Sequence, residues 1–504
     1  MPRLFFFLLV TVFSLPAVAG PGDVASQVRD WRMANEQIIV DRFVELLRIP
    51  NVASDDENIR RNAKHIMEML EMAGMDTNLL ELDGGNPAVY AERLIAGAKT
   101  TILIYVHYDG QPVNPDDWAS EPWTPVMRDD MVENGGSQVP MRAPFDPQWR
   151  IFGRSAGDDK APIVALQSAL MALDAAGITP TVNLKIFMEG EEEAGSPNLR
   201  AMLEKHKDRL AADLWLFCDG PIHQSRRWQL AYGVRGTYGF NLTVYGPNRP
   251  LHSGHYGNWA PNPIALLTDL IGSMRDTHGN VYVDGFYDQA RPLSDAEKAA
   301  IANTPRMDEQ LMAEMGIARP ETEDRLEIAI SRPAMNLRGI SGGNVGSLAR
   351  NAIQPFASAS IGLRLVPDQT PAHMKAIFET HIREQGYFLT SNEPTADERS
   401  EHGRIARVEW SSSGGYPAYR TSFDEPLALK VADILNELSG NTLIQTPTMG
   451  GSLPIYIVDE VLDTPVLILP IANHDNNQHG ANENLRLQNL WDAIEIYAAV
   501  LTGL

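Results

Sequence analysis

Three short apolar runs, each followed directly by a polar turn, constrain the fold of this chain more than any other feature of its sequence. They cover residues 101–106, 182–188 and 214–218, and they are rich in the β-branched and aromatic residues that favour strands. Helix-like segments lie between the runs. Because strands that alternate with helices need crossover connections, the pattern predicts an α/β domain in which helices flank a mixed, mostly parallel sheet.

A different rhythm starts near Tyr232. Three later stretches alternate apolar and polar residues, as strands do when one face of a sheet is exposed; they are 240–245, 357–366 and 405–410. The pattern of the first domain resumes with an apolar helix predicted at 426–438. We therefore expect an α+β domain inserted into the first one. The expected bounds are 20–230 and 421–504 for the first domain and 231–420 for the inserted domain.

Net charge and cysteine content exclude some classes of function. The chain has 504 residues and a formal net charge of −23, with no basic stripe, which argues against nucleic acid as a partner. The single cysteine, Cys218, cannot form an intramolecular disulfide. Because it lies in an apolar run, we expect a buried, inert thiol rather than a nucleophile.

The first 19 residues have the composition of a targeting segment. A short basic start leads into an apolar run that ends in Ala17, Val18 and Ala19. This pattern predicts a secretory signal peptide at 1–19, cleaved after Ala19, and hence a periplasmic or secreted protein. No later segment is apolar enough to cross a bilayer, so we expect no membrane association after cleavage.

Residues that can bind metal follow the predicted strands. His107 comes directly after the first run, and Asp109 is placed to accept the other ring N–H, as the partner of a metal-bound histidine usually does. A structural hydrogen bond is the alternative. Asp158 lies in a glycine-flanked turn before a predicted helix, where it suits a carboxylate that bridges two cations or, equally, a helix cap.

The acidic turn at 189–193 is a stronger signal. Four of its five residues are glutamates, and they follow a buried strand directly. Such carboxylates repel one another unless some bind cations or one keeps a proton. Neighbouring Glu192 and Glu193 could divide the work, one as a general base and the other as a metal ligand.

Two further strand ends complete the candidate set. Asp219 follows the third run, and a polar segment after the predicted strand 466–470 carries both His474 and His479. Spacing does not choose between the two histidines.

Five motifs, taken together and in order, resemble the co-catalytic zinc peptidases of the M20 clan, and within it the carnosinase and dipeptidase branch. The resemblance extends from about residue 30 to the end of the chain. The motifs are His-Tyr-Asp-Gly-Gln-Pro at 107–112, Gly-Arg-Ser-Ala-Gly-Asp-Asp-Lys at 153–160, Glu-Gly-Glu-Glu-Glu-Ala-Gly-Ser at 189–196, Leu-His-Ser-Gly at 251–254 and Gly-Gly-Ser-Leu-Pro at 450–454.

The resemblance implies a role for each candidate. Asp158 would bridge two metals and be followed by a cis peptide bond, with Glu192 as the general base and Asp109 orienting His107. His479 matches the family position because it precedes Gly-Ala-Asn-Glu. The implied metal ligands are His107 and Asp219 at one site, Glu193 and His479 at the other, and Asp158 at both. Mixed nitrogen and oxygen ligands suit two Zn²⁺ ions, with Mn²⁺ or Co²⁺ as replacements.

The resemblance also makes the inserted domain a lid and dimerisation domain. His252 would reach the active site of the partner subunit in a homodimer and stabilise the oxyanion, and Arg364 would bind the substrate carboxylate. From the sequence alone, His252 could equally be a turn residue and Arg364 a solvent-facing strand residue. Pocket-lining backbone N–H groups are implied for Gly450, Gly451 and Ser452.

One departure from the family pattern concerns the substrate. The branch usually has Arg-Glu before the glycine pair, whereas this chain has Thr448 and Met449, so an acid that could attract a substrate amino group is missing. We predict a di-zinc amidohydrolase that cleaves short peptides or N-acyl amino acids. The alternatives are a deacylase or desuccinylase with the same machinery and, in another class, a non-catalytic metal-dependent binding protein.

Overall fold

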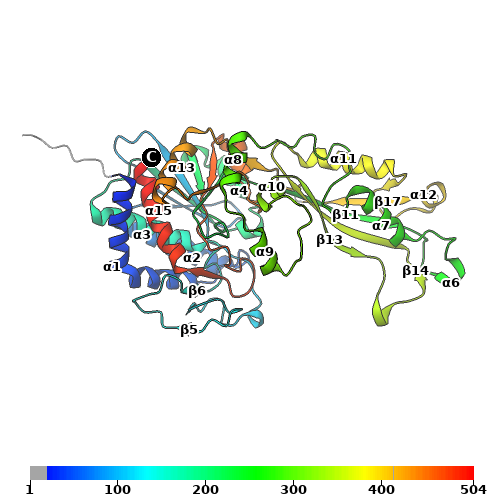
Figure 1. Ribbon diagram of the computed structural model, residues 1–504, viewed down its shortest axis with the longest axis horizontal. Helices are drawn as coiled ribbons and strands as arrows, with labels where there is room; N and C mark the ends of the chain where they lie inside the picture. Colours follow the sequence, from blue (N-terminus) through cyan, green and yellow to red (C-terminus); the bar gives the residue numbers. More distant parts are fainter. Residues whose placement is uncertain (1–19, 413) are drawn as a thin grey trace, which may run out of the picture.

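The computed structural model describes residues 20–412 and 414–504 (Figure 1). Its largest sheet has eight strands in the order β1-β2-β7-β3-β8-β20-β9-β19. Four neighbouring pairs of these described strands are parallel and three are antiparallel, which confirms the predicted mixed, mostly parallel sheet. The strands are β1 Asp76–Leu80, β2 Ala88–Arg93, β3 Thr101–His107, β7 Asn183–Glu189, β8 Leu214–Phe217, β9 Gln229–Ala231, β19 Ile444–Thr446 and β20 Val466–Ile468.

Helices cover both faces of this sheet, because successive side chains of a buried strand point to opposite sides. In β3, Ile102 and Ile104 join a core with the first group of helices, whereas Leu103 and Tyr105 join a second core with the other group. The first group is α1 Pro21–Leu47, α2 Asp56–Met72, α3 Lys160–Ala176, α13 Pro426–Leu438 and α15 Leu487–Gly503. The second is α4 Leu199–Lys205, α5 Lys207–Leu210 and α14 Tyr456–Leu462.

A small four-stranded sheet takes three of its strands from the segment between β3 and α3, which we would describe from the sequence as a long loop over the sheet end. Its order is β21-β6-β4-β5, so it joins that loop to the chain just before α15. The strands are β4 Val126–Arg128, β5 Gln138–Val139, β6 Arg150–Phe152 and β21 Asn484–Arg486, and the short helix η1 Pro115–Asp117 precedes them.

The inserted domain has its own sheet and its own core. Five strands run in the order β13-β15-β11-β17-β16, and buried side chains such as Phe240, Leu363 and Phe378 pack between the sheet and its helices. The sheet strands are β11 Gly236–Tyr245, β13 Ala334–Ser341, β15 Phe356–Leu365, β16 Phe388–Thr390 and β17 Ile405–Trp410. The helices are α7 Pro263–Met274, α11 Pro371–Glu384 and α12 Ala396–Glu401, with η3 Gly346–Leu348 in a loop.

The chain enters and leaves the inserted domain through paired segments, β10 Gly233–Val234 and β18 Tyr419–Arg420. The domain bounds themselves stay a prediction. At the end of the inserted domain farthest from the first domain lie α6 Ser253–Tyr256 and the pair β12 Leu251–His252 and β14 Ala352–Ile353 (Figure 1). Along the described chain, no helix combines the length and the hydrophobicity that a membrane span requires.

The segment between α7 and β13 returns toward the first domain. It forms α8 Asp295–Asn303, α9 Asp308–Met315 and α10 Leu326–Ile330, and α8 packs against β19. In Figure 1, α9 and α10 lie between the two large sheets.

Candidate metal centre

The candidate ligands lie where the central strands of the large sheet end. Because β3, β7 and β8 are parallel neighbours, the residues that follow them meet at one edge of the sheet. Glu193 belongs to the short helix η2, Glu192–Ala194, directly after β7. The five residues are His107 at the end of β3, Asp158 before α3, Glu193 after β7, Asp219 after β8 and His479 between β20 and β21.

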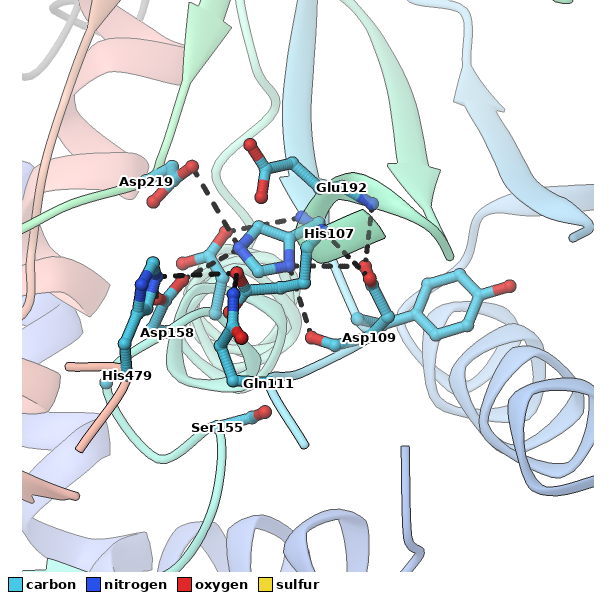
Figure 2. Close-up of polar contacts among 12 residues, drawn as sticks. His107, Asp109, Gln111, Ser155, Asp158, Glu192, Asp219 and His479 are labelled. Atoms are coloured by element: carbon cyan, nitrogen blue, oxygen red, sulfur yellow. Dashed lines mark hydrogen bonds and ion pairs between the residues drawn. The ribbon is translucent and has the colours of Figure 1, made fainter. Parts of the chain in front are cut away.

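The structure brings these five residues together as two groups of three that share Asp158 (Figure 2). In the first group, His107 Nε2 lies 2.8 Å from Asp158 Oδ1 and 3.9 Å from Asp219 Oδ2. In the second group, His479 Nε2 lies 3.2 Å from Asp158 Oδ2 and 3.3 Å from Glu193 Oε2. Within each group, one ligand atom per residue lies within 4.8 Å of the others. The grouping has the pattern that the resemblance implies.

The electrostatics of the cluster fit divalent cations. Burial raises the pKa of Asp219 to about 6 and that of Glu193 to about 7, and Asp158 adds to both shifts as a nearby negative charge. Burial also acts on Asp158, but hydrogen bonds from His107 and His479 hold its pKa below the usual range. Buried carboxylates that repel one another beside two imidazoles are stabilised by bound cations, and this donor set suits zinc.

Asp109 connects the histidine to the acidic turn. Its Oδ1 and Oδ2 atoms accept hydrogen bonds from the backbone N–H groups of Glu192 and Glu193, each at 3.0 Å. The ring atom Nδ1 of His107 lies 3.4 Å from Asp109 Oδ1 and 3.2 Å from the backbone oxygen of Asp109. The expected contact is present, but the backbone oxygen is the nearer acceptor.

Two further residues hold the cluster, and the motifs alone did not identify them. Gln111 Nε2 donates to Glu193 Oε2 at 2.6 Å. Glu483 accepts backbone N–H bonds from the loop that carries Asp158, and the peptide bond between Asp158 and Asp159 in that loop is cis, as expected. Both residues belong to segments that the sequence analysis singled out, Gln111 to the 107–112 motif and Glu483 to the polar segment after His479. Their closeness to the candidate ligands in the sequence could therefore have pointed to them.

A cavity of about 560 Å³ opens beside the cluster. Glu192 lines it without belonging to either group of three ligands. Arg364 lines the same cavity and donates from Nη1 to Ser452 Oγ at 2.7 Å. The structure therefore brings the sequence-predicted pocket residues to the cluster; these are Arg364, Gly450, Gly451 and Ser452.

Among the predicted site residues, His252 is placed elsewhere. It is exposed beside α6 at the far end of the inserted domain, where its Nδ1 accepts the N–H of Gly254 at 3.0 Å (Figure 1). His474 joins neither group of ligands, so the geometry favours His479 as the histidine of the second group. Cys218 is buried, as expected.

Comparison with known proteins gives long matches. Residues 103–503 match the sequence model described as peptidase family M20/M25/M40. The Cys-Gly metallodipeptidase dug1 of Schizosaccharomyces pombe is 26% identical over 481 residues, covering 91% of this chain and 94% of the relative. The Beta-Ala-His dipeptidase of Homo sapiens is 25% identical over 484 residues, covering 91% and 85%. The structure of Dug1p from Saccharomyces cerevisiae has a TM-score of 0.71 at 23% identity, covering 95% of this chain and 98% of that one.

The predicted export is wrong. The fungal relatives are cytosolic proteins, which contradicts a periplasmic or secreted location. The prediction depended on residues 1–19 alone, and these lie outside the residues that the structure describes. An apolar run that ends in small residues is a pattern of composition, and composition does not fix where a folded domain works.

Proposed function

This chain belongs to peptidase family M20/M25/M40 and is an enzyme of the dipeptidase type, and from that premise we propose a dinuclear zinc site that hydrolyses the peptide bond of short peptides. One observation carries the proposal. The two carboxylate oxygens of Asp158 face different histidines, His107 and His479, so one side chain can bridge two cations. Each cation would have one further carboxylate, from Asp219 or from Glu193.

Glu192 is the proposed general base. Two bound zinc ions would supply an activated water and polarise the substrate carbonyl. Glu192 lines the cavity outside both ligand groups, so its carboxylate is free to accept a proton and pass it to the leaving amine. Its backbone N–H is held by Asp109, and this bond fixes the start of the turn that carries Glu192 and Glu193.

The carboxyl end of the substrate would bind at Arg364. This guanidinium is joined to Ser452 and lies near the buried Arg235. Burial and the neighbouring Arg364 lower the pKa of Arg235 to about 10. Two neighbouring guanidinium groups repel each other, and an anion bound between them relieves this repulsion. A substrate carboxylate is an anion of suitable shape. Gly450 and Gly451 offer backbone N–H groups beside them.

We further propose a homodimer joined through the inserted domain. The position of α6 supports it: α6 directly follows His252 and lies at the end of the inserted domain farthest from the first domain, so His252 could act on the cluster of a second chain. Large apolar side chains are exposed on the same domain, Trp259 at 81% and Val345 at 88%. Exposed apolar surface of this kind is typical of an interaction site.

The test is the variant Glu192→Gln in zinc-loaded protein. We expect two bound zinc ions per chain, as in the wild type, and a fall in kcat of about 10²- to 10⁴-fold on Cys-Gly or β-Ala-His, because only the base is lost. Glu204→Gln, an exposed change on α4, is the matched control and should keep full activity. Wild-type protein that binds zinc but hydrolyses neither peptides nor N-acyl amino acids would instead support the non-catalytic binding protein.

A deacylase remains the second candidate, and Met449 is the observation in its favour. The methyl carbon of Met449 lies 3.1 Å from the point where a Cβ on Gly220 would be, directly beside Asp219. An apolar group therefore occupies the position where the family's acid would meet a substrate amino group. N-acetyl amino acids belong in the same substrate panel as free dipeptides.

A further inference from the structure

The short helix α10 forms one wall of the cavity beside the metal cluster. It belongs to the segment that returns from the inserted domain, to which the sequence assigned no role. Leu326, Glu327 and Ile330 line the same cavity as Glu192 and Arg364. If the cavity binds a dipeptide, as proposed above, α10 lies against that substrate.

Glu327 is the acidic residue of this wall. Its side chain is only 11% exposed, and Oε2 accepts a hydrogen bond from Arg325 Nε at 2.6 Å. His223 Nε2 lies 3.4 Å from Oε1. Burial alone would raise the pKa of Glu327, but the bonds from His223 and Arg325 outweigh it and lower the pKa to about 2. The carboxylate is therefore charged at neutral pH.

The guanidinium of Arg325 also donates hydrogen bonds to backbone oxygens outside the cavity. Its Nη1 donates to the backbone oxygen of Ile301 at 2.8 Å, and its Nη2 donates to those of Thr304 and Pro305 at 3.0 and 3.2 Å. These carbonyls belong to the last turn of α8 and to the two residues after it, where backbone oxygens carry partial negative charge. Neither Arg325 nor the three carbonyl residues line the cavity. The positive charge of Arg325 is thus partly balanced away from the cavity, on the side opposite to a substrate.

The contact with His223 leaves Oε1 of Glu327 able to accept a further hydrogen bond. The backbone N–H of Ser225 donates to His223 Nδ1 at 3.1 Å, so the ring proton lies on Nε2 and points to Glu327. The contact at 3.4 Å is long for a hydrogen bond. Because a carboxylate oxygen has two lone pairs, Oε1 can accept a stronger donor from the cavity.

The other end of α10 reaches the cationic part of the cavity. Directly after the helix, the backbone oxygen of Arg332 accepts a bond from Arg235 Nη2 at 2.9 Å, and Arg235 is a close neighbour of Arg364. The acidic side chain of Glu327, in the first turn of α10, and the guanidinium of Arg364 therefore line one and the same cavity.

We propose that Glu327 binds the free amino group of a dipeptide whose carboxylate is held at Arg364, and that it replaces the acid that is missing at Met449. This proposal rests on the proposed peptidase function and makes it more specific. The enzyme prefers unblocked dipeptides to N-acyl amino acids, because a neutral N-acyl group offers no charged donor to Oε1 of the buried carboxylate.

The experiment compares zinc-loaded wild type with Glu327→Gln on two substrates, Ala-Gly and N-acetyl-Ala-Gly. For the wild type we expect a higher kcat/KM on the free dipeptide. For Glu327→Gln we expect KM for Ala-Gly to rise about tenfold or more, as for loss of a hydrogen bond to a charged group, with little change for the blocked peptide. Because the ratio of the two kcat/KM values is taken on one preparation, it does not depend on the folded fraction of the variant.

Glu323→Gln is the matched control. It removes an exposed glutamate four residues earlier, outside the cavity, and should leave the ratio unchanged. An unchanged ratio in Glu327→Gln, or a wild type that prefers the blocked peptide, overturns the inference but not the hydrolase. A wild type that hydrolyses neither peptide overturns the proposed function and the inference with it.

Discussion

Asp109 is the residue on which both halves of the metal cluster depend. One carboxylate accepts the N–H groups of Glu192 and Glu193, and it also lies within 3.4 Å of the His107 ring. A side chain with these contacts fixes His107, Glu192 and Glu193 relative to one another. Partners of this kind, behind metal ligands, strongly affect metal affinity.

We expect Asp109→Asn to lower zinc affinity about 10- to 100-fold, because one carboxylate oxygen becomes an NH₂ group that faces a backbone donor. Competition with a chelator of known affinity measures the change. The matched control is Asp213→Asn, which also removes a carboxylate that accepts a backbone N–H, from Thr101 at the opposite end of β3. Equal affinities for Asp109→Asn and wild type would show that Asp109 does not support the site.

Among single residues, the sequence predicted those whose positions follow from a local strand pattern. His107, Glu193 and Asp219 follow predicted strands, and the ends of neighbouring parallel strands must meet. Arg325 and Glu327 could not be found in this way. Their role depends on where the segment between α7 and β13 folds back, and that is set by packing between segments far apart in the sequence rather than by a local pattern.

Among the elements, the loop before α3 needs the most support, because it presents Asp158 without help from a strand. Glu483, near the start of β21, provides it. Its Oε2 accepts from Arg154 Nη1 at 2.7 Å and from the N–H of Ser155 at 2.9 Å. Its Oε1 accepts from the N–H groups of Gly157 and Asp158, both at 2.9 Å. One buried carboxylate therefore holds most of the loop.

We expect Glu483→Gln to lower both stability and zinc affinity. The amide has one accepting oxygen, so two N–H donors of the loop lose their partner, at a cost of about 1 to 3 kcal/mol each. Thermal unfolding and zinc titration measure the two effects. Glu495→Gln, on α15, weakens the partly buried ion pair with Arg29, far from the metal, and should lower stability alone. If both variants bind zinc like wild type, Glu483 has only a structural role.

Element types were more predictable than element contacts. The apolar runs and alternation that the sequence indicated correspond to β3, β7, β8 and β20 of the first large sheet and to β11, β15 and β17 of the inserted domain, since burial on one face or two leaves a direct mark on composition. The small sheet of β4, β5, β6 and β21 was missed. Its strands have two or three residues each, too few for a periodic pattern, and they form because distant segments supply the partners.

Considered as a whole molecule, the site that we propose is incomplete within one chain. Asp158, Asp219, His479, Glu192 and Arg364 line one cavity, whereas α6, which directly follows His252, lies at the far end of the inserted domain (Figure 1). A two-fold dimer through that domain would allow each chain to supply His252 to the other, because a symmetric interface makes the same contact twice. The sequence motif identified His252, but only the fold shows that its segment lies far from the metal cluster of the same chain.

Mixed dimers test this arrangement. We expect His252→Ala and Glu192→Gln homodimers to be nearly inactive, since each lacks one group at both sites. After subunit exchange, a mixed dimer has one site with Glu192 from the first chain and His252 from the second. Random pairing at equal amounts should therefore restore about a quarter of the wild-type activity, because half of the dimers are mixed and each has one complete site.

The result depends on showing that exchange took place. Two different affinity tags, purified in sequence, isolate the mixed dimers, and their specific activity should then approach half of the wild-type value. If His252 acted within its own chain, one site would lack the histidine and the other the base, so purified mixed dimers would be as inactive as the parents. A chain that stays monomeric at the assay concentration, while fully active, would contradict the shared site directly.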